Sequence, residues 1–255
     1  MGWIRQPTYW LGLLLPTTLF LYLYGTLFIP KQPPAYRPTP APVRLLTFNH
    51  WHGSQSTETA QVILDNALPD IVALQEASPQ AQRRILQTVG QHYPYFFFDT
   101  TIGRRGIGVL SRYPLEKISS NAFIELSCHQ YRVTIDAAYH FRLYNCHPHS
   151  TNVLYYLGNL SSIIQQVQES FRLRTLLGQQ LADEIRAHTE PTIVVGDFNT
   201  TDQSDAYTHL RTILHDAHRA IGWGLGHTFP TYGGYFRQIP IVPRQVRIDM
   251  ILYTN

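Results

Sequence analysis

Three short apolar runs, each ending on polar residues, constrain the fold of this chain more than any other feature. They are VRLLTFN at 43–49, DIVALQE at 70–76 and TIVVGDFN at 192–199. Their length and aliphatic content predict buried strands. Two segments with helical features follow the first two runs, TETAQVILDNAL with a threonine cap and PQAQRRILQTVGQHY with a proline near its start. This order predicts a layered α/β domain over residues 43–255.

The middle of the chain adds further predicted strands and one long helix. GIGVLSRYPL, YRVTIDAAY and FRLYNCH are β-prone and closely spaced, so we expect them to form a meander. The helix covers about residues 157–188 and carries a stripe of leucines at Leu173, Leu176, Leu177 and Leu181. The last strand is expected in VRIDMIL, which contains one acidic residue.

The first 30 residues are not expected to belong to that domain. Between Arg5 and Lys31 the chain has no charge, and YWLGLLLPTTLFLYLYGTLFI would span about 31 Å as a helix, the thickness of a bilayer core. A cleaved signal peptide is the alternative, but its apolar stretch is usually about 7–15 residues and precedes a small-residue cleavage site. We therefore expect a single-pass anchor at 1–30.

A proline-rich linker at 31–42, KQPPAYRPTPAP, is expected to hold the domain off the membrane. The N-terminal flank of the anchor is short, and on this basis we place the domain outside the cytoplasm. We expect a monomer.

Charge and cysteine content narrow the possible partners. The net charge is +3 and the basic residues are scattered, whereas a dedicated duplex-DNA binder typically neutralises roughly 6–10 phosphates. Nucleic acid is therefore not the favoured partner. Cys128 and Cys146 show neither zinc spacing nor a disulfide framework, so we expect free thiols. Pairing is the alternative if the domain lies in an oxidising compartment.

Polar residues recur at the ends of the predicted strands. They are Asn49, Glu76, His147, Asp197, Asn199 and Asp249, the last within the final strand. Each alone has an ordinary explanation as a turn former, a cap neighbour or a loop histidine. Because strand ends of a layered sheet can converge on one crevice, we expect these side chains to form one polar cluster.

Such a cluster suits metal-assisted hydrolysis of a phosphoester. One carboxylate and one amide are hard oxygen ligands of the kind that Mg²⁺ or Mn²⁺ prefers. A second carboxylate can orient an attacking water, an amide two residues later can hold a phosphate oxygen, and an imidazole can donate a hydrogen bond to the phosphate. Zinc is the competitor, because the 12 histidines include HWH at 50–52 and HPH at 147–149. Neither has the H-E-x-x-H spacing, which favours the harder ions.

The motifs LLTFN, DIVALQE, GIGVLSRYPL, LYNCHPHS, IVVGDFNTT and VRIDMIL, in this order, resemble the endonuclease/exonuclease/phosphatase superfamily, which includes DNase I. The resemblance implies a four-layer α/β sandwich with two packed mixed sheets flanked by helices. It also implies that Asn49 and Glu76 are metal-site residues and that His147 contacts the scissile phosphate. By the same resemblance, Asp197 orients the water and Asn199 holds the phosphate. Asp249 is implied to orient a catalytic histidine further along the chain.

The apolar N-terminus, the linker and GWGLGHTFP are similar to bacterial membrane-anchored members, including the VanJ-related group linked with undecaprenyl pyrophosphate. This narrower resemblance implies a phosphoester near the membrane, including a lipid-linked one. The family pattern closes with Ser-Asp-His, and the sequence ends at Asn255 before such a triplet, so we expect the C-terminal end of the domain to be missing. The expected function is a membrane-anchored, divalent-metal-dependent phosphoester hydrolase. The alternatives are a metal-dependent endonuclease and an inactive binding module.

Overall fold

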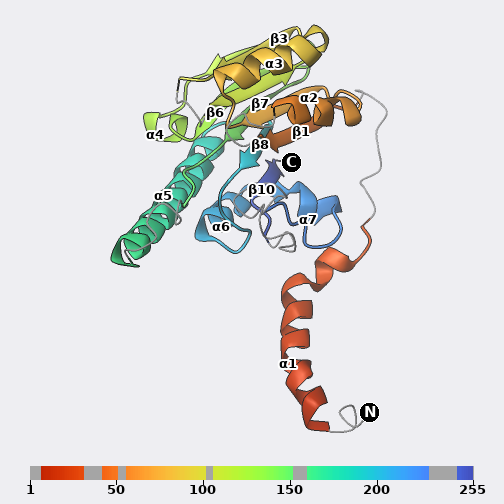
Figure 1. The fold of residues 1–255 in the computed structure, drawn as a ribbon, viewed down its shortest axis with the longest axis vertical. Coiled ribbons are helices and arrows are strands. Elements are labelled where there is room, and N and C mark those ends of the chain that lie inside the picture. Colours follow the sequence, from red (N-terminus) through yellow and green to blue (C-terminus); the bar gives the residue numbers. More distant parts are fainter. Residues whose placement is uncertain are drawn as a thin grey trace.

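The computed structural model describes residues 7–31, 42–50, 56–101, 106–151, 160–229 and 246–254. From residue 45 onward the chain forms two β-sheets packed face to face, with helices against their outer faces (Figure 1). The arrangement is the four-layer α/β sandwich that the sequence predicts.

The first sheet has four strands in the spatial order β1-β2-β4-β3. Their bounds are β1 Leu45–Asn49, β2 Ile71–Gln75, β3 Tyr95–Asp99 and β4 Ile107–Ser111. β1 and β2 run parallel, while β4 is antiparallel to both neighbours, so the sheet is mixed. Helices α2 (Ser56–Asp65) and α3 (Pro79–Val89) cover its outer face, and the short η3 (Gly90–His92) follows α3.

The second sheet has six strands in the order β5-β6-β7-β8-β10-β9. Their bounds are β5 Leu115–Ile118, β6 Cys128–Thr134, β7 His140–Cys146, β8 Thr192–Asp197, β9 His215–Asp216 and β10 Asp249–Tyr253. β7 and β8 are parallel and the other pairs antiparallel, so this sheet is also mixed. The helices on this side are α4 Ala122–Glu125, α5 Leu160–Arg186, α6 Asp205–Arg211 and α7 Ala217–Ile221.

Three clusters of buried apolar side chains hold the layers together. The cluster between the sheets joins Ile71, Ala73 and Val109 to Tyr131, Val133, Leu143 and Val195. The outer clusters pack α2 and α3 on the first sheet and α4, α5 and α6 on the second. Burying one large apolar side chain contributes about 1.5–3 kcal/mol to stability. These contacts therefore hold the two sheets and their helices in fixed positions relative to one another.

Two sequence predictions about this region need correction. β4 and β5 are only three residues apart but belong to different sheets, so the first predicted strand, GIGVLSRYPL, is in fact divided, and the meander is formed by β5, β6 and β7 alone. The chain passes between the sheets at Arg112, whose N–H donates to the Asp70 carbonyl and whose guanidinium pairs with the Asp70 carboxylate at 3.1 Å. Spacing alone does not separate a hairpin from a crossing of this kind. The expectation of free thiols is also wrong, because Cys128 and Cys146 form a disulfide across β6 and β7.

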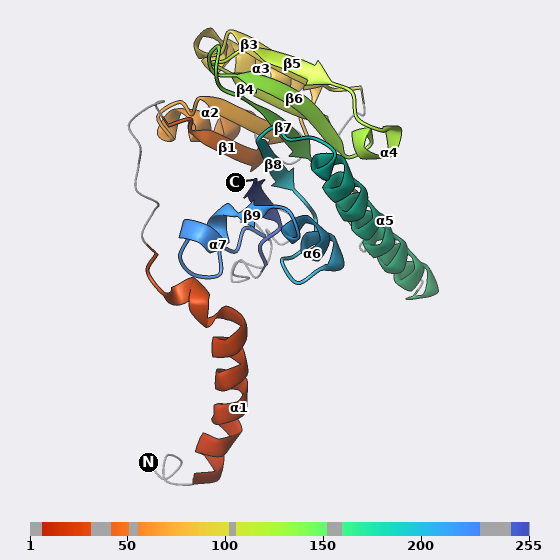
Figure 2. The same cartoon turned by 180° about the vertical axis from the view of Figure 1, so that it is seen from behind.

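The N-terminal helix α1 (Pro7–Tyr24) and the short η2 (Gly25–Phe28) project away from the sandwich (Figures 1 and 2). Residues 10–28 are long and apolar enough to cross a membrane, with a mean hydropathy of 1.6. This criterion concerns length and composition, and a signal sequence also meets it, so the anchor stays a prediction. Residues 32–41 of the predicted linker lie outside the described residues.

Candidate active site at the strand ends

Both sheets contribute to one polar cluster, and strand pairing explains how. β1 and β2 are parallel and in register, so Asn49 at the end of β1 lies beside the end of β2, where Glu76 follows. In the second sheet, β7 and β8 are parallel, which places His147 and Asp197 at the same edge. β10 is antiparallel to β8, and its first residue, Asp249, pairs with Asp197. The predicted convergence of the strand ends is therefore present.

The Asn49 amide joins the two sheets. Its Nδ2 donates to Glu76 Oε1 at 3.0 Å and to Asp197 Oδ2 at 2.9 Å. His147 Nε2 lies 3.6 Å from the same Glu76 oxygen, and both side chains are largely buried. Two carboxylates, an amide and an imidazole thus share one small volume.

The GDFN segment holds Asp197 and Asn199 through a tight turn. Gly196 has φ +137°, and a Cβ there would lie 1.9 Å from the Cys146 carbonyl oxygen, so only glycine fits. Phe198 anchors the turn in the core with 3% of its surface exposed. Asn199 N–H donates to Asp197 Oδ1 at 2.8 Å, and Asn199 Nδ2 donates to the Pro148 carbonyl at 3.0 Å. Asn199 therefore also fixes the segment that carries His147.

Two of the site residues have a left-handed backbone. Glu76 has φ +59° and Asn199 has φ +50°. Asparagine tolerates this conformation, but glutamate adopts it rarely, and such strain tends to be kept at functional positions. The position of Glu76 thus has a conformational cost that folding alone does not explain.

The electrostatics of the cluster are unbalanced. Burial raises the pKa of Asp197 to about 6 and the Glu76 charge adds to this, although the Asn49 and Asn199 hydrogen bonds oppose it. Burial and the Asp197 charge raise the pKa of Asp249 to about 7, against the Thr228 hydrogen bond and the His147 charge. Among the described residues, His147 is the imidazole that acts on Asp249.

Sequence analysis missed several residues that support the site. Arg174 on α5 is buried and donates to the His149 carbonyl and to Thr151 Oγ1, and its charge acts on Asp197. Its signal was a charged residue on the inner face of α5, four positions after the buried Ser170. Behind the cluster, Gln75 Nε2 donates to Asn145 Oδ1 at 2.7 Å and so links β2 to β7.

The donor chemistry of the cluster fits a hard divalent cation. Glu76 and Asn49 supply oxygen-bearing side chains side by side, and Asp197 and Asp249 add negative charge whose ionisation burial opposes. Among the described residues, no group of three or more His, Cys, Asp or Glu side chains is arranged to hold a metal ion. A site here would depend on the amide and on water as well as on the carboxylates.

The two packed mixed sheets and the helices around them make this a DNase I-like fold, and solved structures share it. A β-hairpin deletion mutant of beta toxin from Staphylococcus aureus matches with a TM-score of 0.59 at 14% identity, over 84% of this chain and 87% of that chain. The 3′ phosphatase NExo from Neisseria, bound to a product DNA hairpin, matches with 0.58 at 16%, over 84% and 87%. Sphingomyelinase C from Streptomyces griseocarneus matches with 0.56 at 18%, over 84% of each chain.

The sequence itself matches the Endonuclease/Exonuclease/phosphatase family over residues 46–255, and the chain belongs to that family. The family comprises hydrolases that act on phosphoesters. No curated protein matches the sequence significantly. The narrower resemblance to the VanJ-related group stays a prediction, as do the individual roles of the site residues.

Proposed function

We propose that this chain is a membrane-anchored phosphoester hydrolase that depends on Mg²⁺ or Mn²⁺. The observation that supports this most strongly is the Asn49 amide, which bonds Glu76 of its own sheet and Asp197 of the other. Nothing in folding requires two buried carboxylates at this junction, and burying them is costly. The proposal does not require a second copy, because one chain supplies Asn49, Glu76, His147, Asp197, Asn199 and Asp249.

The residues have separate tasks in this proposal. Glu76 and Asn49 hold the metal ion, which when bound neutralises charge on the phosphate. Asp197 orients the attacking water, and the backbone N–H of Asn199 fixes one of its oxygens. His147 donates a hydrogen bond to the phosphate. Asp249 orients a catalytic histidine, as the family resemblance implies, and it lies close enough to His147 for the imidazole to act on its pKa. Asn199 Nδ2 donates to the Pro148 carbonyl and so positions the neighbouring His147. When substrate binds, we expect Nδ2 to donate to a phosphate oxygen in place of that carbonyl.

The disulfide supports a position outside the cytoplasm. Cys128 and Cys146 are fully buried and bonded to each other, and such bonds persist in oxidising compartments. The bond also lies next to His147, whose N–H donates to the Ser127 carbonyl.

Turnover of p-nitrophenyl phosphate and bis(p-nitrophenyl) phosphate by the full chain tests the proposal. We expect release of p-nitrophenol with Mg²⁺ and loss of it with EDTA. Glu76→Gln should abolish the Mg²⁺-dependent turnover and weaken Mn²⁺ binding measured by calorimetry. Glu58→Gln, which changes an exposed acid on α2, should alter neither measurement. Activity that persists in EDTA would contradict the metal, and no turnover with either substrate would favour the inactive binding module.

A second assay separates this proposal from the endonuclease alternative. The net charge of +3 predicts weak phosphate-backbone contacts, which salt screens strongly. We expect poor nicking of plasmid DNA at about 0.15 M salt relative to a lipid-linked phosphoester. Efficient nicking at that salt would reverse the ranking.

A further inference from the structure

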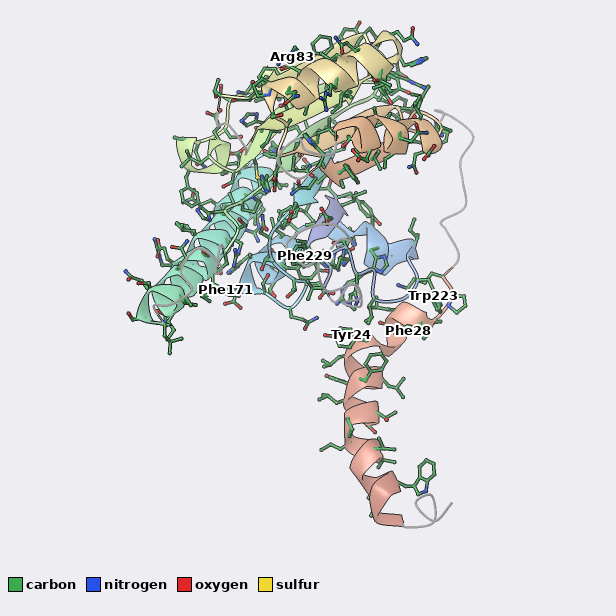
Figure 3. The ribbon with its side chains drawn as sticks, viewed as in Figure 1. Tyr24, Phe28, Arg83, Phe171, Trp223 and Phe229 are labelled. Atoms are coloured by element: carbon green, nitrogen blue, oxygen red, sulfur yellow. A yellow bond between two sulfur atoms is a disulfide. The ribbon has the colours of Figure 1, made fainter. Side chains whose placement is uncertain are left out.

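Six exposed apolar side chains lie on one side of the domain, at two places, whereas Leu64, Leu126 and Tyr139 are exposed singly elsewhere. Leu160, Ile164 and Phe171 lie on the first half of α5, and Ile221, Trp223 and Phe229 lie in and after α7. Phe171, Phe229 and Trp223 appear in Figure 3 on the side from which α1 leaves, with Phe28 and Tyr24 beyond them. We name these six residues the apolar face. Exposed apolar residues scattered singly need no explanation, but a group on one side indicates a contact.

The α5 part of the apolar face is a helical stripe. At about 100° per residue, positions 160, 164 and 171 fall within an arc of about 40°. The second half of α5 packs in the core through Leu177, Leu181 and Ile185, whereas the first half extends past the sheet (Figures 1 and 2). The stripe therefore has no covering layer among the described residues.

The other part of the apolar face contacts η2, the short helix that follows α1. The Phe28 ring meets the Trp223 ring edge to face, with centroids 5.6 Å apart. Gly224 N–H donates to the Leu27 carbonyl at 2.8 Å, and Lys31 Nζ bonds the Arg219 carbonyl. Leu27 is 2% exposed. The apolar helix thus meets the domain at the apolar face, not at the opposite end.

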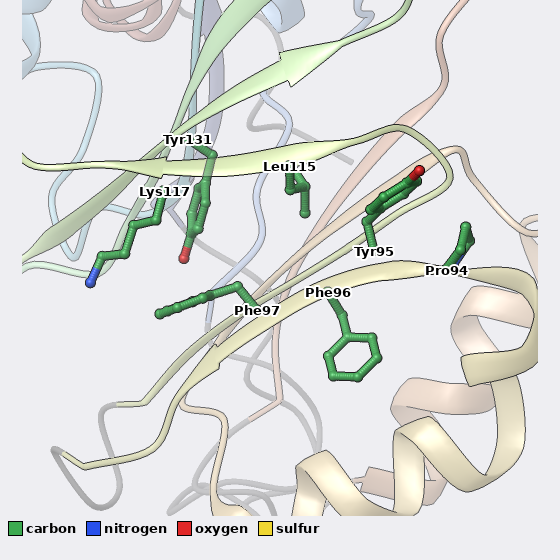
Figure 4. A pocket seen from close by; sticks show the side chains of 7 residues that line it. All are labelled: Pro94, Tyr95, Phe96, Phe97, Leu115, Lys117 and Tyr131. Atoms are coloured by element: carbon green, nitrogen blue, oxygen red, sulfur yellow. The ribbon is translucent and has the colours of Figure 1, made fainter.

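The opposite end of the domain differs in kind. Apart from Pro79 at its start, the exposed positions of α3 are polar, as at Arg83 (Figure 3) and Arg84. Tyr95 and Phe96 on β3 are exposed, but they border a hollow of about 270 Å³ in which Lys117 Nζ lies 5.0 Å above the Phe97 ring (Figure 4). That group carries a cation and does not continue to α1.

We propose that the apolar face rests in the interface of the lipid bilayer that α1 enters, so that the domain lies on the membrane instead of hanging from a linker. This rests on the membrane anchoring in the proposed function. Tryptophan and phenylalanine favour the interface, and an amphipathic helix lies in its plane with the apolar stripe buried. The strand-end cluster borders the same side of the domain. Thr228, which precedes Phe229 of the apolar face, accepts a hydrogen bond at its Oγ1 from Asp249 N–H at 3.3 Å. Substrate would then reach the site from the bilayer surface.

Depth measurements on the full chain test the proposal. Single cysteines are introduced by Phe171→Cys and Trp223→Cys, with Phe96→Cys as the matched control, because Phe96 is 50% exposed and Phe171 is 51% exposed. Each is labelled with a nitrobenzoxadiazole dye while the native disulfide stays intact, and the chain is reconstituted in phosphatidylcholine–phosphatidylglycerol vesicles. Lipids brominated on their acyl chains should quench the dye at 171 and 223 severalfold more than at 96.

Flotation of the same vesicles reports anchoring separately. If the chain floats but the dyes at 171 and 223 are quenched no more than that at 96, the bilayer contact is wrong while the anchor stands. If the chain does not float, the anchor and the contact are both wrong. Ile164→Cys repeats the measurement within the α5 stripe, and a dye there that is not quenched would restrict the contact to the α7 side and overturn the proposal for α5.

Discussion

Two partly buried clusters of charged side chains, one at the strand ends and one beside it, are built in opposite ways. The ion-pair cluster consists of Asp202, Asp216, Arg219 and Arg247, two acids with two bases. Burial would raise the pKa of Asp216, but the hydrogen bonds and charge of Arg247 outweigh it and hold the pKa below its ordinary value. At the strand ends, the three carboxyl groups of Glu76, Asp197 and Asp249 lie near His147 and the charge of Arg174. Among the described residues, neither Asp197 nor Asp249 forms an ion pair with a base, and burial raises the pKa of both aspartates.

The difference separates a structural cluster from a functional one. In the ion-pair cluster, charges of opposite sign meet within hydrogen-bonding distance, so the fold itself accounts for them. At the strand ends the excess negative charge opposes folding, and strongly perturbed carboxyl groups of this kind mark functional sites. Breaking the first cluster should therefore cost stability, and breaking the second should cost activity.

The largest expected effect is on turnover by Asp197→Asn. Removing the carboxylate that orients the water should lower kcat about 10²–10⁴-fold, measured with bis(p-nitrophenyl) phosphate and Mg²⁺. The unfolding midpoint should not fall, because the substitution removes buried negative charge. Asp183→Asn, an exposed acid on α5, is the control. A loss of less than tenfold would remove Asp197 from the proposed chemistry.

The corresponding change in the ion-pair cluster is Arg247→Ala. It leaves the fully buried Asp216 carboxylate without its main cation, which typically costs about 3–5 kcal/mol. Urea unfolding measures the loss. Arg172→Ala, which removes an exposed pair with Glu169, should leave the midpoint almost unchanged. Equal midpoints for the two variants would show that the cluster does not stabilise the fold.

A third change tests whether the strand-end cluster needs support from its surroundings. Cys128→Ala with Cys146→Ala opens a link across a sequence separation of 18, which should cost about 3 kcal/mol by chain entropy. Turnover should also fall at temperatures well below the transition, since Cys146 precedes His147. Refolding from urea in the presence of dithiothreitol, which reaches the buried bond only in the unfolded chain, should reproduce both effects in the wild type and have none on the variant. A reduced wild type that keeps its midpoint and its turnover would contradict this support.

Sequence reasoning located the strand-end cluster but not its surroundings, for a physical reason. Asn49, Glu76 and Asp197 each follow an apolar run that predicts a buried strand. The carboxyl end of such a strand lies at the edge of its sheet, where several strand ends can meet. Arg174 and the disulfide depend on pairing between distant segments. The Cys128–Cys146 bond follows from the register Thr134↔His140 by counting six residues along each strand, but that register depends on a turn that the sequence did not specify.

The balance of charge was also not visible in the sequence. Asp202, Asp216 and Asp249 are the same residue type, and the sequence does not show which of them is paired with a base. Their charged partners are set by the side chains that the fold brings next to each carboxylate. Arg247 lies two residues before Asp249, yet its hydrogen bonds go to Asp216. Residues two apart in a strand face the same side of the sheet, but Arg247 precedes the first residue of β10, so the strand pattern did not predict its partner.

The smallest expected effect is a difference in pH dependence between Asp249→Asn and Asp216→Asn, measured by urea unfolding in EDTA. The folded pKa of Asp249, about 7, lies above its ordinary value of 3.8. The stability linked to its protonated form is therefore full below 3.8 and is lost as pH rises through about 7. Asp249→Asn removes this ionisation, so its stability relative to the wild type should be greater at pH 8 than at pH 4. The pH dependence of stability has the opposite sign for Asp216, because its folded pKa is lowered. The stability from its ionised form is present above the ordinary value of 3.8 and is lost as pH falls through the lower folded value. Asp216→Asn should therefore destabilise the fold at pH 7 and approach the wild type in strong acid. If Asp249→Asn were the less stable form at pH 8, the strand-end cluster would be held together by its charges, and its contrast with the ion-pair cluster would be lost.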